Sequence, residues 1–72
     1  MRVLGFDPGT ATTGYGVVEG KASRLTHIAH GTITTPAKQH FALRLKTIHE
    51  EATRLLELYQ PDAVAIEKLY FK

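Results

Sequence analysis

A chain of 72 residues forms one domain at most, and so short a chain buries a smaller share of its surface than an average domain. It contains no cysteine, which excludes disulfides and thiolate metal sites, and a hydrophobic content of 43% excludes a disordered chain. The net charge of +2 is compatible with nucleic-acid binding but does not argue for it, because the basic residues are scattered.

Three strands are predicted in the first half of the chain. Residues 3–7 form a nearly all-apolar run that stops at Asp7, typical of a central strand buried on both faces, and Pro8 and Gly9 must end it. Residues 13–19 predict a second strand, with a turn at residues 20–21. Residues 25–34 alternate apolar and polar side chains, which predicts an antiparallel, half-exposed strand; Gly31 within it indicates a bulge or a close backbone approach.

A helix and a fourth strand are predicted in the second half. Thr35 followed by Pro36 predicts the helix start, with a hydroxyl N-cap before a proline at the first helical position. Apolar residues then recur at alternating steps of four and three and form one stripe: Phe41, Leu45, Ile48, Ala52, Leu55 and Tyr59. Pro61 ends the helix. Residues 63–67 are a second apolar run that ends in an acid, Glu67.

The predicted order β-β-β-α-β indicates an α/β fold with a mixed sheet and one crossover helix. A crossover of this length normally returns to a parallel neighbour, and the strand that ends at Asp7 is the expected neighbour of the last strand. The helix then covers one face of the sheet. No predicted element covers the other face, so we expect the complete domain to contain further chain.

Asp7 and Glu67 each stand at the carboxyl end of a buried strand. If these strands are parallel neighbours, about 4.8 Å apart, both carboxylates emerge at the sheet edge where α/β proteins bind ligands. Two such carboxylates repel unless one keeps a proton or a cation lies between them, and hard oxygen ligands favour Mg²⁺ or Mn²⁺. From spacing alone a structural role is favoured, with Asp7 opening a turn and Glu67 paired with Lys68 or another cation. The match between two separate strand ends favours the metal.

The histidines predict no metal site. His27 and His30 are three residues apart on a strand, so we expect them to point to opposite faces. His40 and His49 lie on the predicted helix, away from its apolar stripe. Solvated side chains are therefore expected for all four.

Two segments resemble a known family. The first is GFDPGTATTGYGVV at residues 5–18, in which a strand ending in Asp-Pro-Gly is followed by Thr-Gly-Tyr-Gly-Val. The second is QPDAVAIE at residues 60–67, a proline-led turn into a strand that ends in Glu. With Arg44, Leu45, Lys46 and Ile48 on the crossover helix, they resemble the RuvC family of Holliday-junction resolvases, with compatible spacing from Val3 to Phe71.

The resemblance implies an RNase H-like fold and a homodimer that cuts four-way DNA junctions symmetrically with Mg²⁺, for which Mn²⁺ can substitute. It also implies junction branch-migration motor proteins as partners. Asp7 matches the first catalytic acid of the family and Glu67 the second. Two further acids of the family lie in its C-terminal part, so residues 1–72 are interpreted as the N-terminal portion of a single nuclease domain, inactive on their own.

Further residues are candidates for contact with DNA. In the family an aromatic residue just after the second acid can stack on bases, and Tyr70 stands at that place with Phe71 adjacent. A core role for both aromatics is the alternative. Lys68, beside the acid, is a candidate for contact with the DNA backbone, and Thr10 is a weaker candidate for contact with a phosphate.

Other functions stay open on the sequence. Actin-like ATPases and sugar kinases begin their first phosphate loop with a strand, Asp, Gly and Thr, close to Asp7–Thr10, but Glu67 with an aromatic soon after it suits a nuclease better. Other RNase H-like resolvases share the strand-terminal Asp. A non-catalytic module that self-associates through its uncovered sheet face is the third possibility. With neither a signal peptide nor a membrane span at the N-terminus, we expect a cytoplasmic protein that does not contact membranes.

Overall fold

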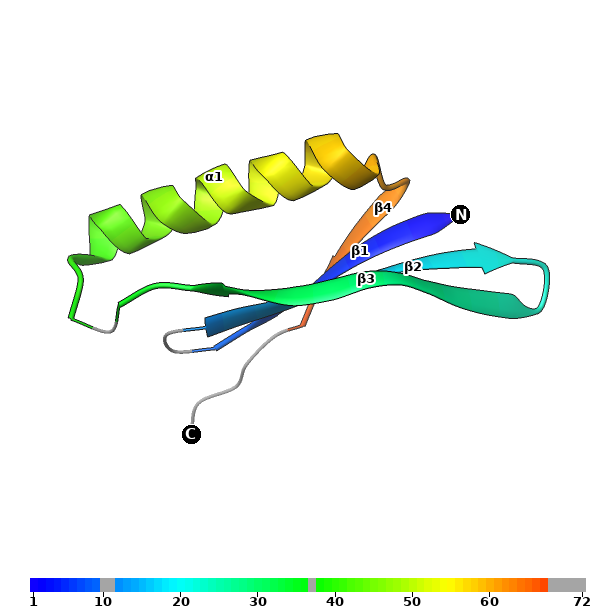
Figure 1. Cartoon of the computed structure of the whole chain (residues 1–72), viewed down its shortest axis with the longest axis horizontal. Coiled ribbons are helices and arrows are strands. Elements are labelled where there is room, and N and C mark those ends of the chain that lie inside the picture. Colours follow the sequence, from blue (N-terminus) through cyan, green and yellow to red (C-terminus); the bar gives the residue numbers. More distant parts are fainter. Residues whose placement is uncertain (10–11, 37, 68–72) are drawn as a thin grey trace.

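A mixed sheet with one helix lying along one face forms the protein (Figure 1). The computed structural model describes residues 1–9, 12–36 and 38–67. Its elements follow the order β1 (Arg2–Pro8), β2 (Thr12–Lys21), β3 (Arg24–Thr34), α1 (Phe41–Tyr59) and β4 (Ala63–Ile66). The four strands lie side by side in the order β3-β2-β1-β4, with β4 parallel to β1 and the other neighbours antiparallel. The predicted topology and the parallel pairing are confirmed.

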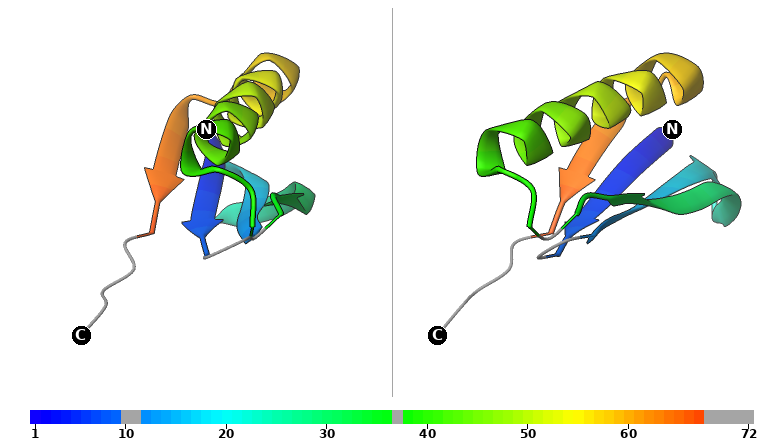
Figure 2. Two further views of the ribbon diagram at one scale, coloured as in Figure 1. Left: turned by 90° about the vertical axis from the view of Figure 1, so that its left-hand side faces the viewer. Right: turned by 60° about the vertical axis from the view of Figure 1, so that its left-hand side comes forward.

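The strand register divides the side chains between two faces of the sheet. Leu4 lies opposite Val17, and both are wholly buried on the face that α1 covers. Because side chains alternate along a strand, Gly5 and Asp7 belong to the other face, with their β2 partners Gly16 and Gly14. Figure 2 shows that no described element covers this second face, which we call the open face.

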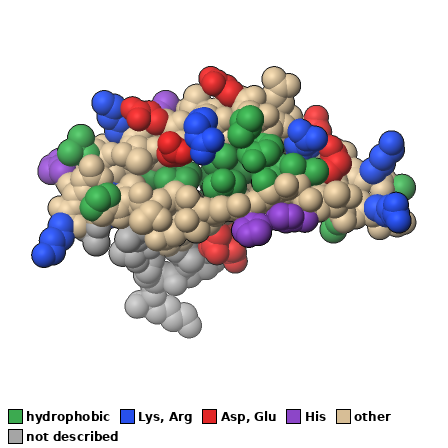
Figure 3. Space-filling model, in the orientation of Figure 1, with side chains coloured by type: hydrophobic (Ala, Val, Ile, Leu, Met, Phe, Trp, Pro, Cys, Tyr) green, Lys and Arg blue, Asp and Glu red, His purple; other side chains and the backbone are tan. Residues whose placement is uncertain are grey.

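The core is small and lies between α1 and the middle of the sheet. Its fully or nearly buried apolar side chains are Leu4, Val17, Ile33 and Leu55. The predicted apolar stripe of α1 packs there from Ile48 onward, because Ile48, Leu55 and Tyr59 belong to or pack against the core, whereas Phe41 is 68% exposed and Leu45 50%. Figure 3 shows hydrophobic side chains still at the surface between helix and sheet.

The helix begins later than predicted. Its first residue is Phe41, and His40 is the N-cap, whose Nδ1 accepts a hydrogen bond from the Ala42 amide at 3.2 Å. The prediction of Thr35 as the cap was wrong, because the Thr35 side chain is buried and its hydroxyl accepts a hydrogen bond from Arg44 Nε at 3.1 Å. Among the described residues, no helix is long and apolar enough to cross a membrane.

The hairpin between β2 and β3 also turns later than predicted. Gly20 and Lys21 belong to β2 and pair with Leu25 and Arg24, so the turn consists of residues 22 and 23. The amide of Gly20 donates to the Met1 carbonyl at 2.8 Å, which carries the β1–β2 pairing past Arg2. Ala22 takes up the left-handed backbone conformation, with φ at 56°.

A β-bulge in β3 overturns the prediction for two of the histidines. The register shifts between Val17, which pairs with Ala29, and Val18, which pairs with His27, so Ile28 is an extra residue. His27 and His30 therefore lie on the same face, with His27 Nε2 2.9 Å from His30 Nδ1. The prediction of opposite faces assumed an unbroken alternation, and the extra residue breaks it.

Gly31 is a place of close approach, although the bulge lies elsewhere. Tyr15 pairs with Gly31 across the β2–β3 ladder, and its ring lies over the glycine. A Cβ atom on Gly31 would stand 2.6 Å from the Tyr15 hydroxyl oxygen. The approach is by a side chain rather than by backbone, so a larger residue at this position would have to displace the Tyr15 ring.

Hydrogen bonds join the start of β1 to the end of α1 and the start of β4. Arg2 Nη1 donates to the carbonyl of Tyr59, the last helical residue, at 2.9 Å. The amide of Arg2 donates to Asp62 Oδ2 at 2.7 Å, and the amide of Asp62 donates to the Arg2 carbonyl at 2.8 Å. We call Arg2, Tyr59 and Asp62 the terminal clamp, because they fix where β4 starts alongside β1.

Candidate active site

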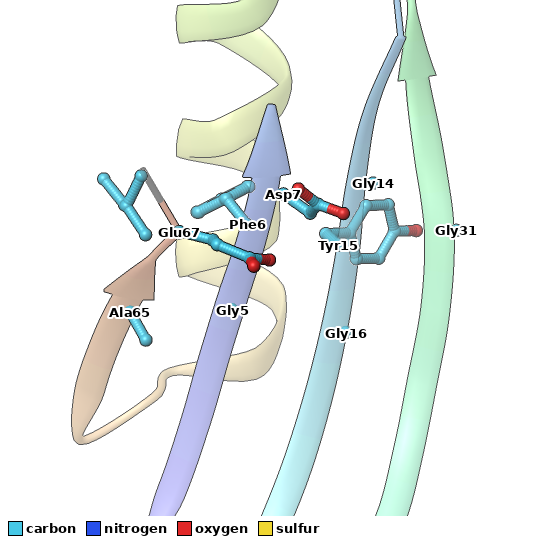
Figure 4. A pocket seen from close by; sticks show the side chains of 10 residues that line it. Gly5, Phe6, Asp7, Gly14, Tyr15, Gly16, Gly31, Ala65 and Glu67 are labelled. Carbon is cyan, nitrogen blue, oxygen red and sulfur yellow. The ribbon is translucent and has the colours of Figure 1, made fainter. Parts of the chain in front are cut away.

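Asp7 and Glu67 lie at the carboxyl ends of the two parallel strands. The register pairs Phe6 with Ile66, so Asp7 and Glu67 are the next residues along β1 and just beyond β4. The amide of Glu67 donates to the Phe6 carbonyl at 3.1 Å, which extends the ladder by one bond. Neighbouring strands lie about 4.8 Å apart, which places the two residues side by side. Figure 4 shows both carboxyl groups in front of the strands, on the open face.

The acids border a shallow hollow that glycines keep open. It has a volume of about 530 Å³ and is lined by Gly5, Phe6, Asp7, Gly14, Tyr15, Gly16, Gly31, Ala65, Ile66 and Glu67. Three of the glycines, Gly5, Gly14 and Gly16, share the open face with Asp7 (Figure 4). A Cβ atom on Gly16 would meet nothing within 4 Å. The absence of side chains leaves room for a bulky ligand in front of the carboxylates.

No role in the site was predicted for these glycines. The signal that could have found them is their spacing, because Gly14 and Gly16 alternate with Thr13, Tyr15 and Val17 along β2. A strand with glycine at every second position has one face without side chains.

Both carboxylates are available to a ligand. Asp7 and Glu67 are exposed, and neither side chain has an ion pair or hydrogen bond within the described part of the chain. By contrast, three described acids of β2 and α1 form ion pairs: Glu19, Glu50 and Glu51. Over residues 1–9, 12–36 and 38–67, no group of three or more His, Cys, Asp or Glu residues is placed to hold a metal ion. The site therefore presents two oxygen ligands.

A tight turn leads the chain away from Asp7. The amide of Gly9 donates to the Thr12 carbonyl at 2.8 Å. A Cβ atom on Gly9 would stand 2.6 Å from that same oxygen, which belongs to backbone and cannot easily move aside. Glycine is required here for that reason. Thr12 belongs to β2, which therefore begins one residue earlier than predicted.

The four residues predicted to contact DNA lie outside the described residues. They are Thr10, which follows Gly9 in the sequence, and Lys68, Tyr70 and Phe71, which follow Glu67. The predicted pairing of Glu67 with Lys68 lies outside them as well.

The family of the chain follows from comparison with known proteins. A family model described as "Crossover junction endodeoxyribonuclease RuvC" matches residues 3–72. The chain belongs to the RuvC family. It is similar to the RuvC proteins of Syntrophomonas wolfei, with 52% identity over 99% of this chain, and of Geobacter sulfurreducens, with 49% identity over 97%. It spans 41% and 43% of the length of these two relatives.

Solved structures confirm the fold. Thermus thermophilus RuvC matches with a TM-score of 0.84 and 32% identity, over 99% of this chain and 45% of that one. The same protein in complex with a Holliday junction substrate matches with a TM-score of 0.88 and 30% identity, over 100% and 44%. The sheet is therefore the RNase H-like sheet of RuvC. The PPX-GPPA enzyme of Aquifex aeolicus matches with a TM-score of 0.67 at 18% identity, over 92% of this chain and 25% of that one, which shows a shared fold alone.

Family membership decides between the enzyme alternatives. The fold alone could not separate the ATPase interpretation from the nuclease interpretation, because the PPX-GPPA enzyme shares it. The match over residues 3–72 includes both acidic strand ends and favours RuvC.

Proposed function

We propose that residues 1–72 are the N-terminal portion of a RuvC-type nuclease domain, in which Asp7 and Glu67 are two of the acids that hold catalytic metal. The observation that carries the proposal is the pair of exposed, unpartnered carboxylates at the ends of β1 and β4, beside a hollow on the open face. The parent enzyme is proposed to make symmetric, metal-dependent cuts in four-way DNA junctions as a cytoplasmic homodimer, with branch-migration motor proteins as partners.

The residues present fit Mg²⁺, with Mn²⁺ as a substitute. Both donors are carboxylates, which are the ligands that hard cations prefer, and neither imidazole nor thiolate borders the hollow. Mg²⁺ usually keeps several waters and takes one or two protein carboxylates, with phosphate oxygens completing its shell. When bound, such an ion polarises a phosphodiester and lowers the pKa of the water that it coordinates.

The protein groups orient that chemistry. The hydrogen bond from the Glu67 amide to the Phe6 carbonyl and the β1–β4 register hold the backbones of the two acidic residues side by side. The glycines of the open face leave space for a sugar-phosphate backbone to approach them. Lys68 and Thr10 are proposed to contact the DNA backbone, and Tyr70 and Phe71 to stack on bases at the junction, each stacked base contributing about 1–3 kcal/mol.

Metal binding by the acids is testable on the chain itself. Mn²⁺ added to the ¹⁵N-labelled chain is expected to broaden amide signals of residues around Asp7 and Glu67. Asp7→Asn and Glu67→Gln are each expected to abolish the broadening, because a single remaining carboxylate binds the ion too weakly. Glu57→Gln is the matched control, since Glu57 is an exposed helical acid.

The nuclease assignment needs the rest of the domain. A chimaera of residues 1–72 with the remaining C-terminal part of the S. wolfei relative is expected to cut a labelled four-way junction with Mg²⁺. Asp7→Asn in the chimaera should lower the cleavage rate by on the order of 10²–10³-fold or more, the loss seen when one group that stabilises a transition state is removed. Chimaera cleavage that is unaffected by Asp7→Asn, or cleavage by residues 1–72 alone, would refute the proposal.

A further inference from the structure

A pair of imidazoles on β3 forms a second polar cluster, separate from the acids. His27 Nε2 and His30 Nδ1 are 2.9 Å apart, and the ring centroids are 4.9 Å apart with an interplanar angle of 49°. Both side chains are exposed. His30 pairs with Gly16 and His27 with Val18, so both side chains belong to the open face. Figure 3 shows histidine side chains gathered on one patch of the surface.

The pair lies on the same face as the acids but too far away to join them. Across the ladder, Asp7 pairs with Gly14 and Gly14 with Thr32, two residues beyond His30. Two strand spacings and two residues along β3 correspond to roughly 12 Å between the Cα atoms of Asp7 and His30. A single ion cannot bridge that distance, so the two clusters are separate.

We propose that His27 and His30 form a chelating site for a late first-row divalent metal ion, Ni²⁺, Cu²⁺ or Zn²⁺. Two nitrogens bound to one ion at about 2.0–2.1 Å stand roughly 2.9 Å apart in square-planar geometry and roughly 3.3 Å apart in tetrahedral geometry. The nitrogen–nitrogen distance of 2.9 Å is close to the square-planar spacing, so binding requires the exposed rings to rotate until both lone pairs converge, with little change in that distance. Zn²⁺ requires the rings to separate by a few tenths of an ångström, which exposed side chains on one strand can do.

The pair can bind a metal ion by a change of tautomer alone, with no net change in the charge of the protein. In the hydrogen-bonded pair one of the two facing nitrogens carries the hydrogen and the other accepts it. When both rings take the tautomer with the hydrogen on the outer nitrogen, His27 Nδ1 and His30 Nε2, both facing nitrogens present lone pairs. The outer nitrogens can then donate to water, which keeps each tautomer in place.

The bulge is what creates the site. Without Ile28 as an extra residue, the spacing of three would send the imidazoles to opposite faces of the sheet. The donor set is also chemically distinct from Asp7 and Glu67, because imidazole nitrogen favours Ni²⁺, Cu²⁺ and Zn²⁺, whereas carboxylates favour Mg²⁺ and Mn²⁺. Two protein ligands leave the remaining positions of the ion open to water.

Direct observation of the rings tests the proposal on the full chain. Zn²⁺ or Ni²⁺ is titrated into the ¹⁵N-labelled chain while the ring nitrogens are followed by long-range ¹H–¹⁵N spectra. The signals of His27 Nε2 and His30 Nδ1 are expected to shift with Zn²⁺, or broaden with Ni²⁺, together and with one equivalence point, while those of His49 stay in place. Equal responses from His49, or no response from His27 and His30, would show a hydrogen-bonded pair only and overturn the site.

Variants give the second measurement, by calorimetric titration with Zn²⁺. His27→Ala and His30→Ala are each expected to weaken binding by on the order of tenfold or more, as loss of one of two ligands implies. His49→Ala is the matched control and is expected to leave binding unchanged. The double variant Asp7→Asn, Glu67→Gln is expected to keep Zn²⁺ binding and lose Mn²⁺ binding, so failure of one site is distinguished from failure of the other. Loss of Zn²⁺ binding in that double variant would assign the ion to the carboxylates instead.

Discussion

The terminal clamp offers a test of how the fold sets the spacing of the acids. We predict that Arg2→Met lowers the free energy of unfolding, because it removes the hydrogen bond from Arg2 Nη1 to the Tyr59 carbonyl at the C-terminus of α1. Methionine keeps the apolar stem of the side chain, so the change isolates the charged head. The two hydrogen bonds that the Arg2 backbone makes with the Asp62 amide and carboxylate remain in the variant.

The expected magnitude follows from the contacts of the guanidinium. A hydrogen bond from a charged donor contributes about 1.5–3 kcal/mol, and the 35% exposure of the Arg2 side chain places it at the lower end of that range. The Arg2–Glu19 ion pair, at 3.4 Å and one-third exposed, adds at most about 0.5 kcal/mol. Arg2 Nε is the atom that forms this ion pair and makes no hydrogen bond, so the pair is counted at that low value. A net loss of about 1.5 kcal/mol corresponds to a fall in Tm of roughly 6–12 °C for a chain of this size.

Thermal unfolding followed by circular dichroism measures the shift. Arg54→Met is the matched control, because Arg54 forms an exposed helical ion pair with Glu51 at 3.0 Å, which contributes no more than about 0.5 kcal/mol. The exchange rate of the Glu67 amide with solvent is a second readout, since that amide bonds to Phe6 at the other end of the β1–β4 pair. If the two variants unfold at the same temperature, the clamp contributes no more than a surface ion pair and the reasoning fails.

Two further substitutions test the core and the close approach in the sheet. Leu55→Ala is expected to destabilise by about 2–4 kcal/mol in chemical denaturation, because Leu55 is 1% exposed in a core of few residues, whereas Leu58→Ala, at 60% exposure, should change the midpoint little. Equal effects of the two would contradict the assigned helix face. Gly31→Ala is expected to cost about 1–3 kcal/mol, because its Cβ would stand 2.6 Å from the Tyr15 hydroxyl oxygen. Tyr15→Phe removes the nearest atom and should recover part of that loss in a double-mutant cycle, and full additivity of the two changes would count against the contact.

The strands and the acids could be predicted because each signal was local. Both β1 and β4 are short apolar runs that stop at an acid, and a long crossover helix between them limits β4 to a parallel partner. The family resemblance rested on those same segments and is confirmed by the match over residues 3–72. The roles of Asp7 and Glu67 stay predictions, which the Mn²⁺ titration and the chimaera test.

The errors arose where tertiary contacts override local preference. Thr35 has the side chain of a helix cap, but burial and the bond from Arg44 hold it in another role, and the helix starts six residues later. Glycine favours turns, but at position 20 the pairing with Met1 and Leu25 extends the strand through it. The bulge at Ile28 has no local signature at all, since it is defined by the register between β2 and β3.

The core and the candidate site obey a single constraint, which is the alternation of side chains along β1. Leu4 is wholly buried against α1, and Asp7, three residues later, is exposed on the opposite face. A slip of one residue in β1 would turn Leu4 to solvent and Asp7 into the core, and both changes are unfavourable. The apolar contacts of Leu4 with Val17 and Leu55 therefore hold the Asp7 carboxylate beside Glu67 without touching either acid. Because burial of Leu4 fixes the register of β1, the packing of this small core sets the geometry in which a metal ion would be bound.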